Sequence, residues 1–92
     1  MNSELTKEFI DLFKKLPPNI QNIAKHNYKL WKDNPNHPSL AFKKIHRRKL
    51  IYSIRVGIGW RAIGVMKDRK TIVWFWIGSH NDYDRLIKKL KI

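Results

Sequence analysis

The stretch "LIYSIRVGIGWRAIGVM" (residues 50–66) carries the clearest structural signal in the chain. Its first half alternates in hydropathy with the period of two that is typical of a β-strand, and "WRAIGVM" has the pattern of a second strand. Gly57 and Gly59 bracket a turn between them. The pattern therefore predicts a β-hairpin, in which one face of the first strand carries Leu50, Tyr52, Ile54, Val56 and Ile58 and the other carries Ile51, Ser53 and Arg55.

A further strand is predicted after this hairpin. "KDRK" (residues 67–70) is a turn, and "TIVWFWIG" (residues 71–78) is apolar on both faces, which is typical of a central or doubly covered strand. Alternation predicts that Trp74 and Trp76 share one face, while Phe75 and Ile77 take the opposite one. "NDYDRLIKKLKI" (residues 81–92) then predicts a short closing helix with basic residues at the negative end of its dipole.

Two amphipathic helices are predicted before residue 40. Ser3 or Asn2 caps the first helix, and Pro17-Pro18 separates it from the second. The second helix ends near Asp33, because a residue that precedes a proline avoids the helical region. "FKKIH" (residues 42–46) is a short strand. The apolar positions at helical spacing are Leu5, Phe9, Leu12, Phe13 and Leu16 in the first helix, and Ile20, Ile23, Ala24, Tyr28 and Trp31 in the second.

Together these elements predict a single α+β domain over residues 1–92. The predicted order is ααββββα, in which the two N-terminal helices form an αα-hairpin and a short helix closes the chain. A chain of 92 residues is long enough for one modest core but not for two. We see no internal repeat, no low-complexity linker and no domain boundary.

Charge is the strongest compositional signal. Twenty Lys and Arg residues face seven Asp and Glu residues, and a formal net charge of +13 favours polyanionic partners such as RNA or DNA. The longest apolar run, residues 72–77, is too short to span a bilayer, and no secretory signal is visible. The absence of cysteine excludes disulfides and thiolate chemistry, and it agrees with the cytoplasmic location that we expect.

The positive charge is concentrated between residues 43 and 70, where Asp68 is the only acidic residue. Arg55 and Arg61 lie inside predicted strands that pair across the turn, so their guanidinium groups can converge on one face. Two fixed guanidinium groups suit a phosphate, whereas the alternative, a structural ion pair, lacks nearby carboxylates. A second group lies on the short strand and in the following turn, where it can hold phosphates or simply be solvated: Lys43, Lys44, Arg47, Arg48 and Lys49.

The titratable side chains favour metal-free over metal-dependent chemistry. The four histidines lack ligand spacing, and only Asp82 and Asp84 form a close acidic pair, so we expect no metal and no cofactor. Metal-free RNA cleavage uses the 2′-hydroxyl as nucleophile and needs a proton-transfer group and cations beside the phosphate. His80, Tyr83, Arg55 and Arg61, with Asp82, are the candidates. The structural alternatives are helix capping for His80 and Asp82, and packing for Tyr83.

Several segments resemble the RelE/ParE superfamily of bacterial toxins from toxin–antitoxin pairs. They are "YSIRVGIGWRAIG" and "TIVWFWIGSHNDYDRLI", together with the "LPPNIQ" joint and "NPNHPSLAFKKI", and they cover almost the whole chain. The resemblance implies a fold in which an N-terminal α-helical hairpin packs on a four-stranded antiparallel sheet, with a short C-terminal helix. In the RNA-cleaving branches it also implies a sheet face that binds mRNA in the ribosomal A site, and an acidic antitoxin that wraps the toxin.

The resemblance also implies roles for individual residues. Arg61, in "GWR", matches the strand arginine that acts on the scissile phosphate, and Arg55 matches a position where several members carry Lys or Arg. His80, in "GSHNDY", is similar to the acid–base histidine, and Tyr83 to an aromatic residue that stacks on a base or assists proton transfer. Ser53 stands where some members have a lysine, so that helper is missing. His46 is a looser parallel to a second histidine.

The function that follows is a ribosome-associated, metal-independent endoribonuclease toxin. Arg55, Arg61, His80 and Tyr83 are its catalytic candidates, and the five basic residues between positions 43 and 49 bind RNA. Its partners are an acidic cognate antitoxin, in a higher-order toxin–antitoxin assembly, and mRNA with the ribosome; no membrane partner is expected. Two alternatives stay open, namely a non-enzymatic gyrase inhibitor of the ParE branch and a non-toxic basic RNA-binding module.

Overall fold

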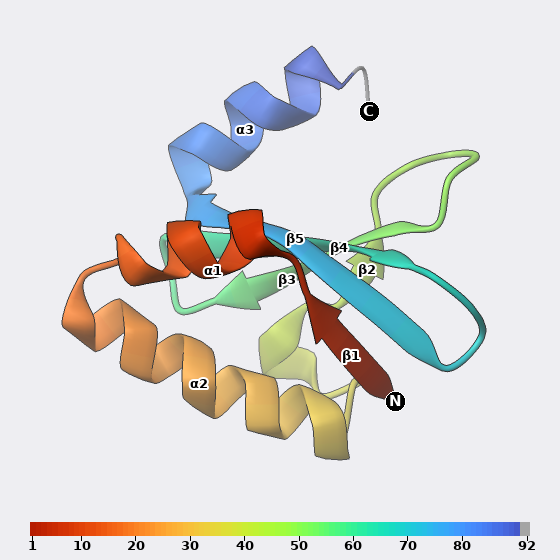
Figure 1. Ribbon diagram of the computed structural model, residues 1–92, viewed down its shortest axis with the longest axis horizontal. Helices are drawn as coiled ribbons and strands as arrows, with labels where there is room; N and C mark the ends of the chain where they lie inside the picture. Colours follow the sequence, from red (N-terminus) through yellow and green to blue (C-terminus); the bar gives the residue numbers. More distant parts are fainter. Residues whose placement is uncertain (91–92) are drawn as a thin grey trace.

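The computed structural model describes residues 1–90, which form an α+β fold as predicted. Five strands form one mixed sheet in the order β1-β5-β4-β3-β2, and Figure 1 shows α2 and α3 on opposite sides of it. α1 packs on β5 and α2 on β3. The elements are β1 (Asn2–Leu5), α1 (Lys7–Lys14), α2 (Pro18–Asp33), a 3-10 turn (Pro38–Leu40), β2 (Lys43–Lys44), β3 (Ile51–Val56), β4 (Trp60–Met66), β5 (Thr71–Ser79) and α3 (His80–Lys89).

The two predicted hairpins form the centre of the sheet. β3 and β4 pair antiparallel from Ile51 opposite Val65 to Val56 opposite Trp60, and β5 pairs antiparallel with the other edge of β4. Gly57 adopts a positive φ of 66° in the first turn, a conformation that glycine reaches without a steric penalty. Ile58, which alternation assigned to the apolar face, is instead fully exposed in this turn.

A fifth strand is the main departure from the prediction. Residues Asn2–Leu5 form β1, which pairs parallel with the first half of β5, so the sheet has five strands and is not purely antiparallel. The first helix accordingly begins at Lys7, and its cap is Thr6, whose hydroxyl accepts from the backbone N–H of Phe9 at 3.1 Å. The prediction that Ser3 or Asn2 caps this helix was wrong, because the free edge of β5 offers these residues backbone hydrogen bonds.

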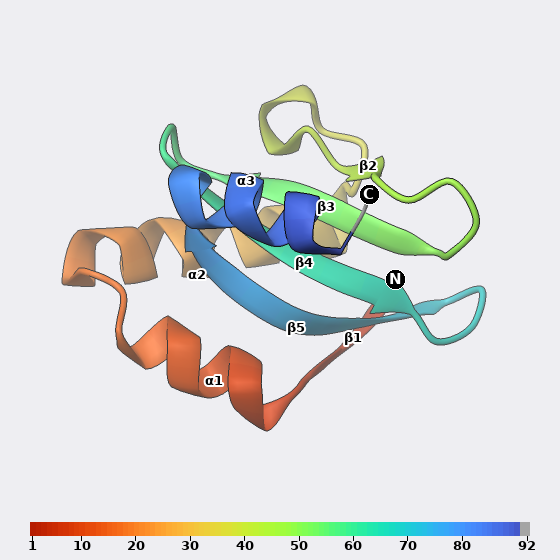
Figure 2. The ribbon, with the colours of Figure 1, turned by 90° about the horizontal axis from the view of Figure 1, so that it is seen from above.

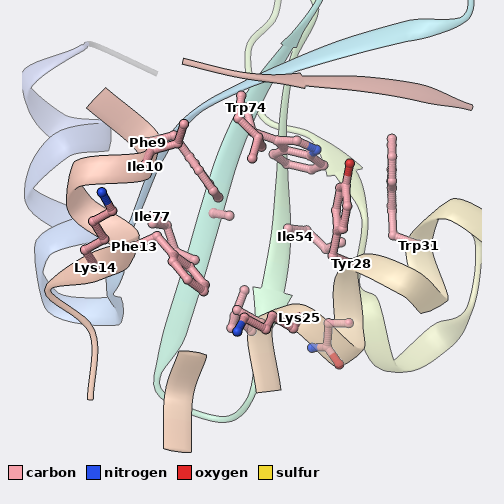
Figure 3. A pocket seen from close by; sticks show the side chains of 15 residues that line it. Phe9, Ile10, Phe13, Lys14, Lys25, Tyr28, Trp31, Ile54, Trp74 and Ile77 are labelled. Atoms are coloured by element: carbon pink, nitrogen blue, oxygen red, sulfur yellow. The ribbon is translucent and has the colours of Figure 1, made fainter. Parts of the chain in front are cut away.

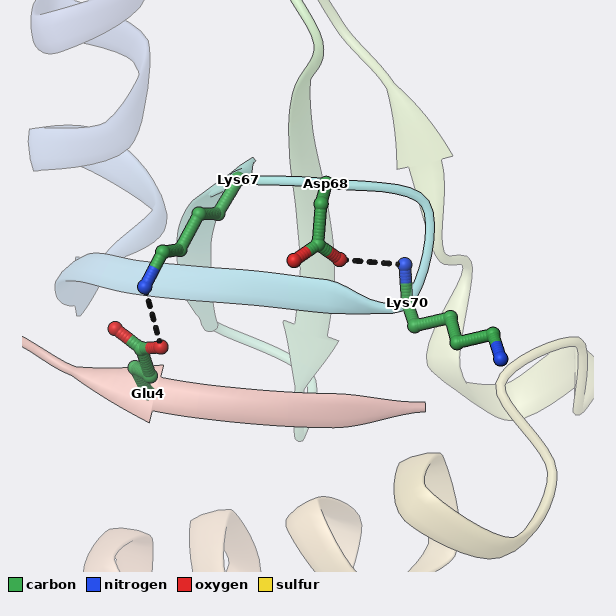
Figure 4. A network of polar contacts seen from close by, with 4 residues as sticks. All are labelled: Glu4, Lys67, Asp68 and Lys70. Carbon is green, nitrogen blue, oxygen red and sulfur yellow. Dashed lines mark hydrogen bonds and ion pairs between the residues drawn. The ribbon is translucent and has the colours of Figure 1, made fainter.

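Polar contacts fasten β1 to the turn between β4 and β5 (Figure 4). Lys67 forms an ion pair of 3.1 Å with Glu4, and the backbone N–H of Asn2 donates to the carbonyl of Lys70. Within the turn, the Asp68 carboxylate accepts from the backbone N–H of Lys70 at 2.8 Å. That hydrogen bond is the main reason why the pKa of Asp68 lies below its ordinary value.

A β-bulge in β5 changes which side chains share a face. Gly64 lies opposite Trp74 and Ile63 lies opposite Trp76, so Phe75 is the extra residue on its strand. Trp74 therefore faces the helices α1 and α2 with Ile77, whereas Trp76 faces α3. The predicted grouping of Trp74 with Trp76 was wrong, because one inserted residue resets the alternation.

The core lies between the sheet and the helices α1 and α2. Trp31 is fully buried, and its ring packs edge-on against Trp74 and Phe42, with centroid distances of 5.3 and 5.8 Å. Leu40 and Ile72 are also fully buried. The opposite face of the sheet carries α3 (Figure 2). The catalytic candidates that were selected from the sequence lie at one end of this face. Among the described residues, no helix is long and apolar enough to cross a membrane.

Candidate functional site

Arg55 and Arg61 are direct cross-strand neighbours at the turn end of β3 and β4. Side chains that face each other in this way have Cβ atoms about 5 Å apart, so two like charges are held together without an intervening carboxylate. Arg55 is exposed, whereas Arg61 is partly buried. The Nη1 atom of Arg61 is buried and has no hydrogen-bond partner within residues 1–90. The pair is therefore a positive site with an unused donor.

Tyr83 connects Arg61 to His80. The tyrosine side chain is 6% exposed, the Arg61 guanidinium lies 5.4 Å from its ring centroid, and the His80 ring stacks against it at 6.1 Å with an interplanar angle of 17°. Trp76 packs against the same ring at 6.3 Å. The phenol thus fixes the relative positions of a guanidinium and an imidazole that come from different elements.

The first turn of α3 directs the His80 side chain. The cap is Ser79, whose hydroxyl accepts from the backbone N–H of Asp82 at 3.2 Å, so neither His80 nor Asp82 is needed for capping. The Nε2 atom of His80 lies 3.7 Å from a carboxylate oxygen of Asp84, one helical turn later. Asp82 instead pairs with Arg85 at 2.7 Å and does not join the arginine pair.

The predicted RNA-binding lysines and arginines do not all lie on one surface. Lys43 lies opposite Ser53, which is two residues before Arg55 on the same face of β3, so Lys43 extends the arginine pair by about 7 Å along the strand. Lys44 lies opposite Tyr52 and belongs to the other face. The remaining three, Arg47, Arg48 and Lys49, are exposed in the loop at the opposite end of β3.

His46 has a structural position in that loop. Its Nδ1 atom accepts hydrogen bonds from the backbone N–H groups of Arg48 and Lys49 at 3.1 and 3.0 Å. A ring nitrogen that accepts two backbone donors holds the loop in shape and carries no proton itself. His46 is also on a different element from His80, at the far end of β3.

An apolar groove of about 410 Å³ lies on the other side of the sheet, between α1 and α2. Phe9 and Phe13 line it from α1, and Figure 3 shows Tyr28 on the opposite wall above Ile54. Lys14 and Lys25 also line the groove. The predicted helical hairpin is therefore open: the two helices pack on the sheet and leave this space between them.

Sequence reasoning missed two residues of the site. Asp84 follows His80 by four residues, a spacing that places both on one helix face, so the signal was available once His80 was assigned to the helix. Trp76 could not be found, because the bulge at Phe75 decides its face. Within residues 1–90, no group of three or more His, Asp or Glu side chains lies close enough together to hold a metal ion.

Comparison with known proteins identifies the family. The sequence model of the ParE-like toxin domain matches residues 18–85, which is about three quarters of the chain. The chain belongs to the ParE-like toxin domain family. This confirms the resemblance to the RelE/ParE superfamily that the strand and helix motifs indicated. No curated protein sequence matches the chain.

Solved structures of the superfamily share the fold. The RelB–RelE antitoxin–toxin complex of Methanococcus jannaschii contains a similar chain, with a TM-score of 0.71, 23% identity and coverage of 89% of this chain and 96% of that one. YafQ from Escherichia coli strain BL21(DE3) has a TM-score of 0.71, 16% identity and coverage of 89% and 96%. The isolated E. coli RelE toxin has a TM-score of 0.66, 15% identity and coverage of 97% of each chain. Identities this low establish the shared fold.

Proposed function

We propose that the chain is the toxin of a toxin–antitoxin pair and that it cleaves mRNA on the ribosome as a metal-independent endoribonuclease. One observation carries this proposal: Arg61 and His80 meet around Tyr83, and Arg55 lies directly across from Arg61 on the same face of the sheet. Cations beside the phosphate and an imidazole for proton transfer are the groups that cleavage through the RNA 2′-hydroxyl requires. A purely structural surface has no need for two arginines opposite each other.

In this proposal the RNA supplies its own nucleophile. The 2′-oxygen forms a bond to phosphorus as the bond from phosphorus to the 5′-oxygen breaks, which leaves a 2′,3′-cyclic phosphate and a free 5′-hydroxyl. His80 carries one of the two proton transfers, and water exchanges the other proton. Arg55 and Arg61 stabilise the extra negative charge on the phosphorane, where removing a single such donor costs about 100- to 1000-fold in kcat.

The unpaired Nη1 atom of Arg61 supports the phosphate assignment. A buried N–H group without a partner costs about 1–3 kcal/mol, so it is normally satisfied unless function requires otherwise. A phosphate oxygen would satisfy it. Tyr83 is too buried to present a free ring face to a base, so in this proposal it holds His80 and Arg61 in position.

We propose that the cognate partner is an acidic antitoxin in the cytoplasm and that the pair forms higher-order assemblies. The similar chains of M. jannaschii and Mycobacterium tuberculosis were solved as antitoxin–toxin complexes. The groove between α1 and α2 suits an amphipathic helix of such a partner, because its floor is apolar and Lys14 and Lys25, which also line it, can pair with acidic residues of that helix.

The decisive experiment compares the chain with its His80→Ala variant during expression in growing bacteria. We expect growth arrest and new mRNA 5′ ends within translated codons for the parent chain, and loss of both for the variant. Asn81→Ala is the matched control, because Asn81 is exposed in the same helical turn. Equal arrest and equal cleavage by the parent and His80→Ala would remove His80 from the mechanism.

A non-enzymatic gyrase inhibitor is the second candidate, favoured by the ParE-like family match. Inhibition of purified gyrase in a supercoiling assay, without ribosome-dependent mRNA cleavage, would select it. The third candidate, a basic RNA-binding module, is favoured by the net charge of +13. It requires salt-sensitive RNA binding without any effect on growth.

A further inference from the structure

A second cleft lies beside the candidate site, between the end of α1 and the first turn of α3. Its volume is about 320 Å³, and it opens where the outer edge of β5, opposite the edge that pairs with β4, has no strand partner, because β1 ends opposite Trp74. We call it the tryptophan cleft, since two indole rings form part of its wall. Its lining residues from the sheet and α3 are Trp60, Trp76, Ile77, Gly78, Ser79 and Asp82, and those from α1 are Leu12, Lys15 and Leu16.

The two indoles of this cleft differ from the other two in the chain. Trp31 and Trp74 are 0% and 3% exposed and belong to the core. Trp60 and Trp76 are only partly buried, and both line the cleft. The register places Trp76 on the same face of the sheet as Arg61, whereas Trp60 lies on the face that packs on α1 and α2. Because the Tyr83 ring is itself covered by its neighbours, Trp76 is the accessible indole next to the arginine pair.

Trp76 links the tryptophan cleft to the candidate site. Trp76 lies 6.3 Å from the Tyr83 ring, which in turn contacts the Arg61 guanidinium and the His80 ring. Lys15 supplies a positive charge at the cleft, and the charge of Asp82 is offset by its pairing with Arg85. A nucleic acid strand with a phosphate at Arg61 therefore passes the Trp76 indole, in a cleft to which Lys15 adds a cation.

Gly78 allows Trp76 to take this position. A Cβ atom at residue 78 would lie 2.7 and 2.9 Å from the Cζ2 and Cη2 atoms of the Trp76 ring, so the indole lies directly against the strand backbone. An alanine there would push the ring away. Gly59, on the neighbouring turn, has no atom within 4 Å of its would-be Cβ and offers a matched control.

We propose that the tryptophan cleft binds one base of the RNA substrate, stacked on the Trp76 indole next to the nucleotide whose phosphate lies at Arg61. Planar bases suit such a surface regardless of sequence, and loss of one stacking partner weakens single-strand binding by about five- to 150-fold. The inference rests on the proposed function in that the ligand is RNA. It assigns Trp76 to substrate binding and leaves proton transfer to His80.

The test uses a 2′-O-methyl oligonucleotide, which cannot be cleaved because its 2′-oxygen is blocked. Binding to the full chain is followed by tryptophan fluorescence and by anisotropy of a labelled oligonucleotide. We expect quenching on binding, a loss of affinity of about five- to 150-fold for Trp76→Leu, and a smaller loss for Gly78→Ala. Gly59→Ala should bind like the parent chain. An otherwise identical oligonucleotide that lacks one base should bind the parent chain more weakly.

The outcomes separate this inference from the nuclease proposal. Tight base-dependent binding without any RNA cleavage keeps the cleft and removes the nuclease. Equal affinities of folded Gly78→Ala and Gly59→Ala, or equal binding of the oligonucleotide with and without the base, would overturn the cleft as a base site. Binding of an extended acidic peptide in place of RNA would also overturn it. If Trp76→Leu does not fold, Gly78→Ala and the abasic oligonucleotide decide the question.

Discussion

Replacing Arg61 by methionine should make the protein more stable while it abolishes the proposed activity. Methionine has a similar length and no polar atoms. The substitution removes a buried Nη1 atom without a hydrogen-bond partner and a like charge directly opposite Arg55. It also removes the contact between the guanidinium and the Tyr83 ring at 5.4 Å. The net effect depends on which of these contributions is larger.

The buried donor is the largest contribution. Leaving an N–H group buried and unpaired costs about 1–3 kcal/mol. The facing like charge costs a few tenths of a kcal/mol up to about 1 kcal/mol. The cation–π contact, which Arg61→Met loses, stabilises the parent chain by about 0.5–1 kcal/mol at a partly exposed site and so reduces the expected gain. We therefore expect Arg61→Met to raise the free energy of unfolding by about 1 kcal/mol, which corresponds to about 4–8 °C in Tm for a domain of this size.

Urea denaturation and thermal melting of the free chain measure this difference. Arg55→Met is the control, because Arg55 is exposed and its replacement relieves only the like-charge repulsion. Its smaller gain should shrink as salt is added, whereas the gain from Arg61→Met should persist, since salt does not screen a missing hydrogen bond. Inorganic phosphate, compared with chloride at equal ionic strength, should stabilise the parent chain more than the Arg61→Met variant.

A lower stability of Arg61→Met would refute this reasoning. A loss of 1 kcal/mol or more would mean that Arg61 is a structural residue whose contacts outweigh its unpaired donor. An unchanged response to phosphate would mean that the arginine pair is not an anion site, whatever its stability.

Three further predictions concern other parts of the fold. The pKa of Asp68 is lowered mainly by the backbone N–H of Lys70, so the stabilisation is present above the ordinary carboxyl pKa and is lost as pH falls through the lowered one. Asp68→Asn should therefore flatten the acid side of a plot of urea midpoint against pH. Trp31→Ala, at a fully buried position, should cost about 3–5 kcal/mol in urea denaturation and loosen the core, as judged by near-ultraviolet circular dichroism. Ala24→Met should fill part of the apolar groove, stabilise the chain by about 1 kcal/mol, and weaken antitoxin binding in calorimetry.

The central hairpins were predictable because the sequence signals that specify them involve only residues that are close together in the chain. Alternation between Tyr52 and Val56 and the turn at Gly57 each depend on neighbours in sequence, and the structure confirms them. β1 was missed because Leu5 also fits the helical spacing of the residues after it. Only a free sheet edge, formed by residues about 70 positions later, makes a strand the better choice.

The candidate site shows the same division. Residue types and spacing were enough to select Arg55, Arg61, His80 and Tyr83. The sequence could not predict that Tyr83 would be covered, that an arginine nitrogen would lack a partner, or that Trp76 would turn toward α3. These features depend on a single-residue bulge and on where the last helix lies across the sheet.

The sequence by itself determined the strongly positive charge, the hairpin with its two arginines, and the family to which the chain belongs. Hydrophobic period and turn chemistry act over a few residues, so they can be read directly from the chain. The tertiary structure alone decided the parallel edge strand, the open groove between α1 and α2, and the tryptophan cleft. Each of these arises from packing between segments that are distant in sequence. Burial of one face of a strand or helix determines which side chains its other face exposes.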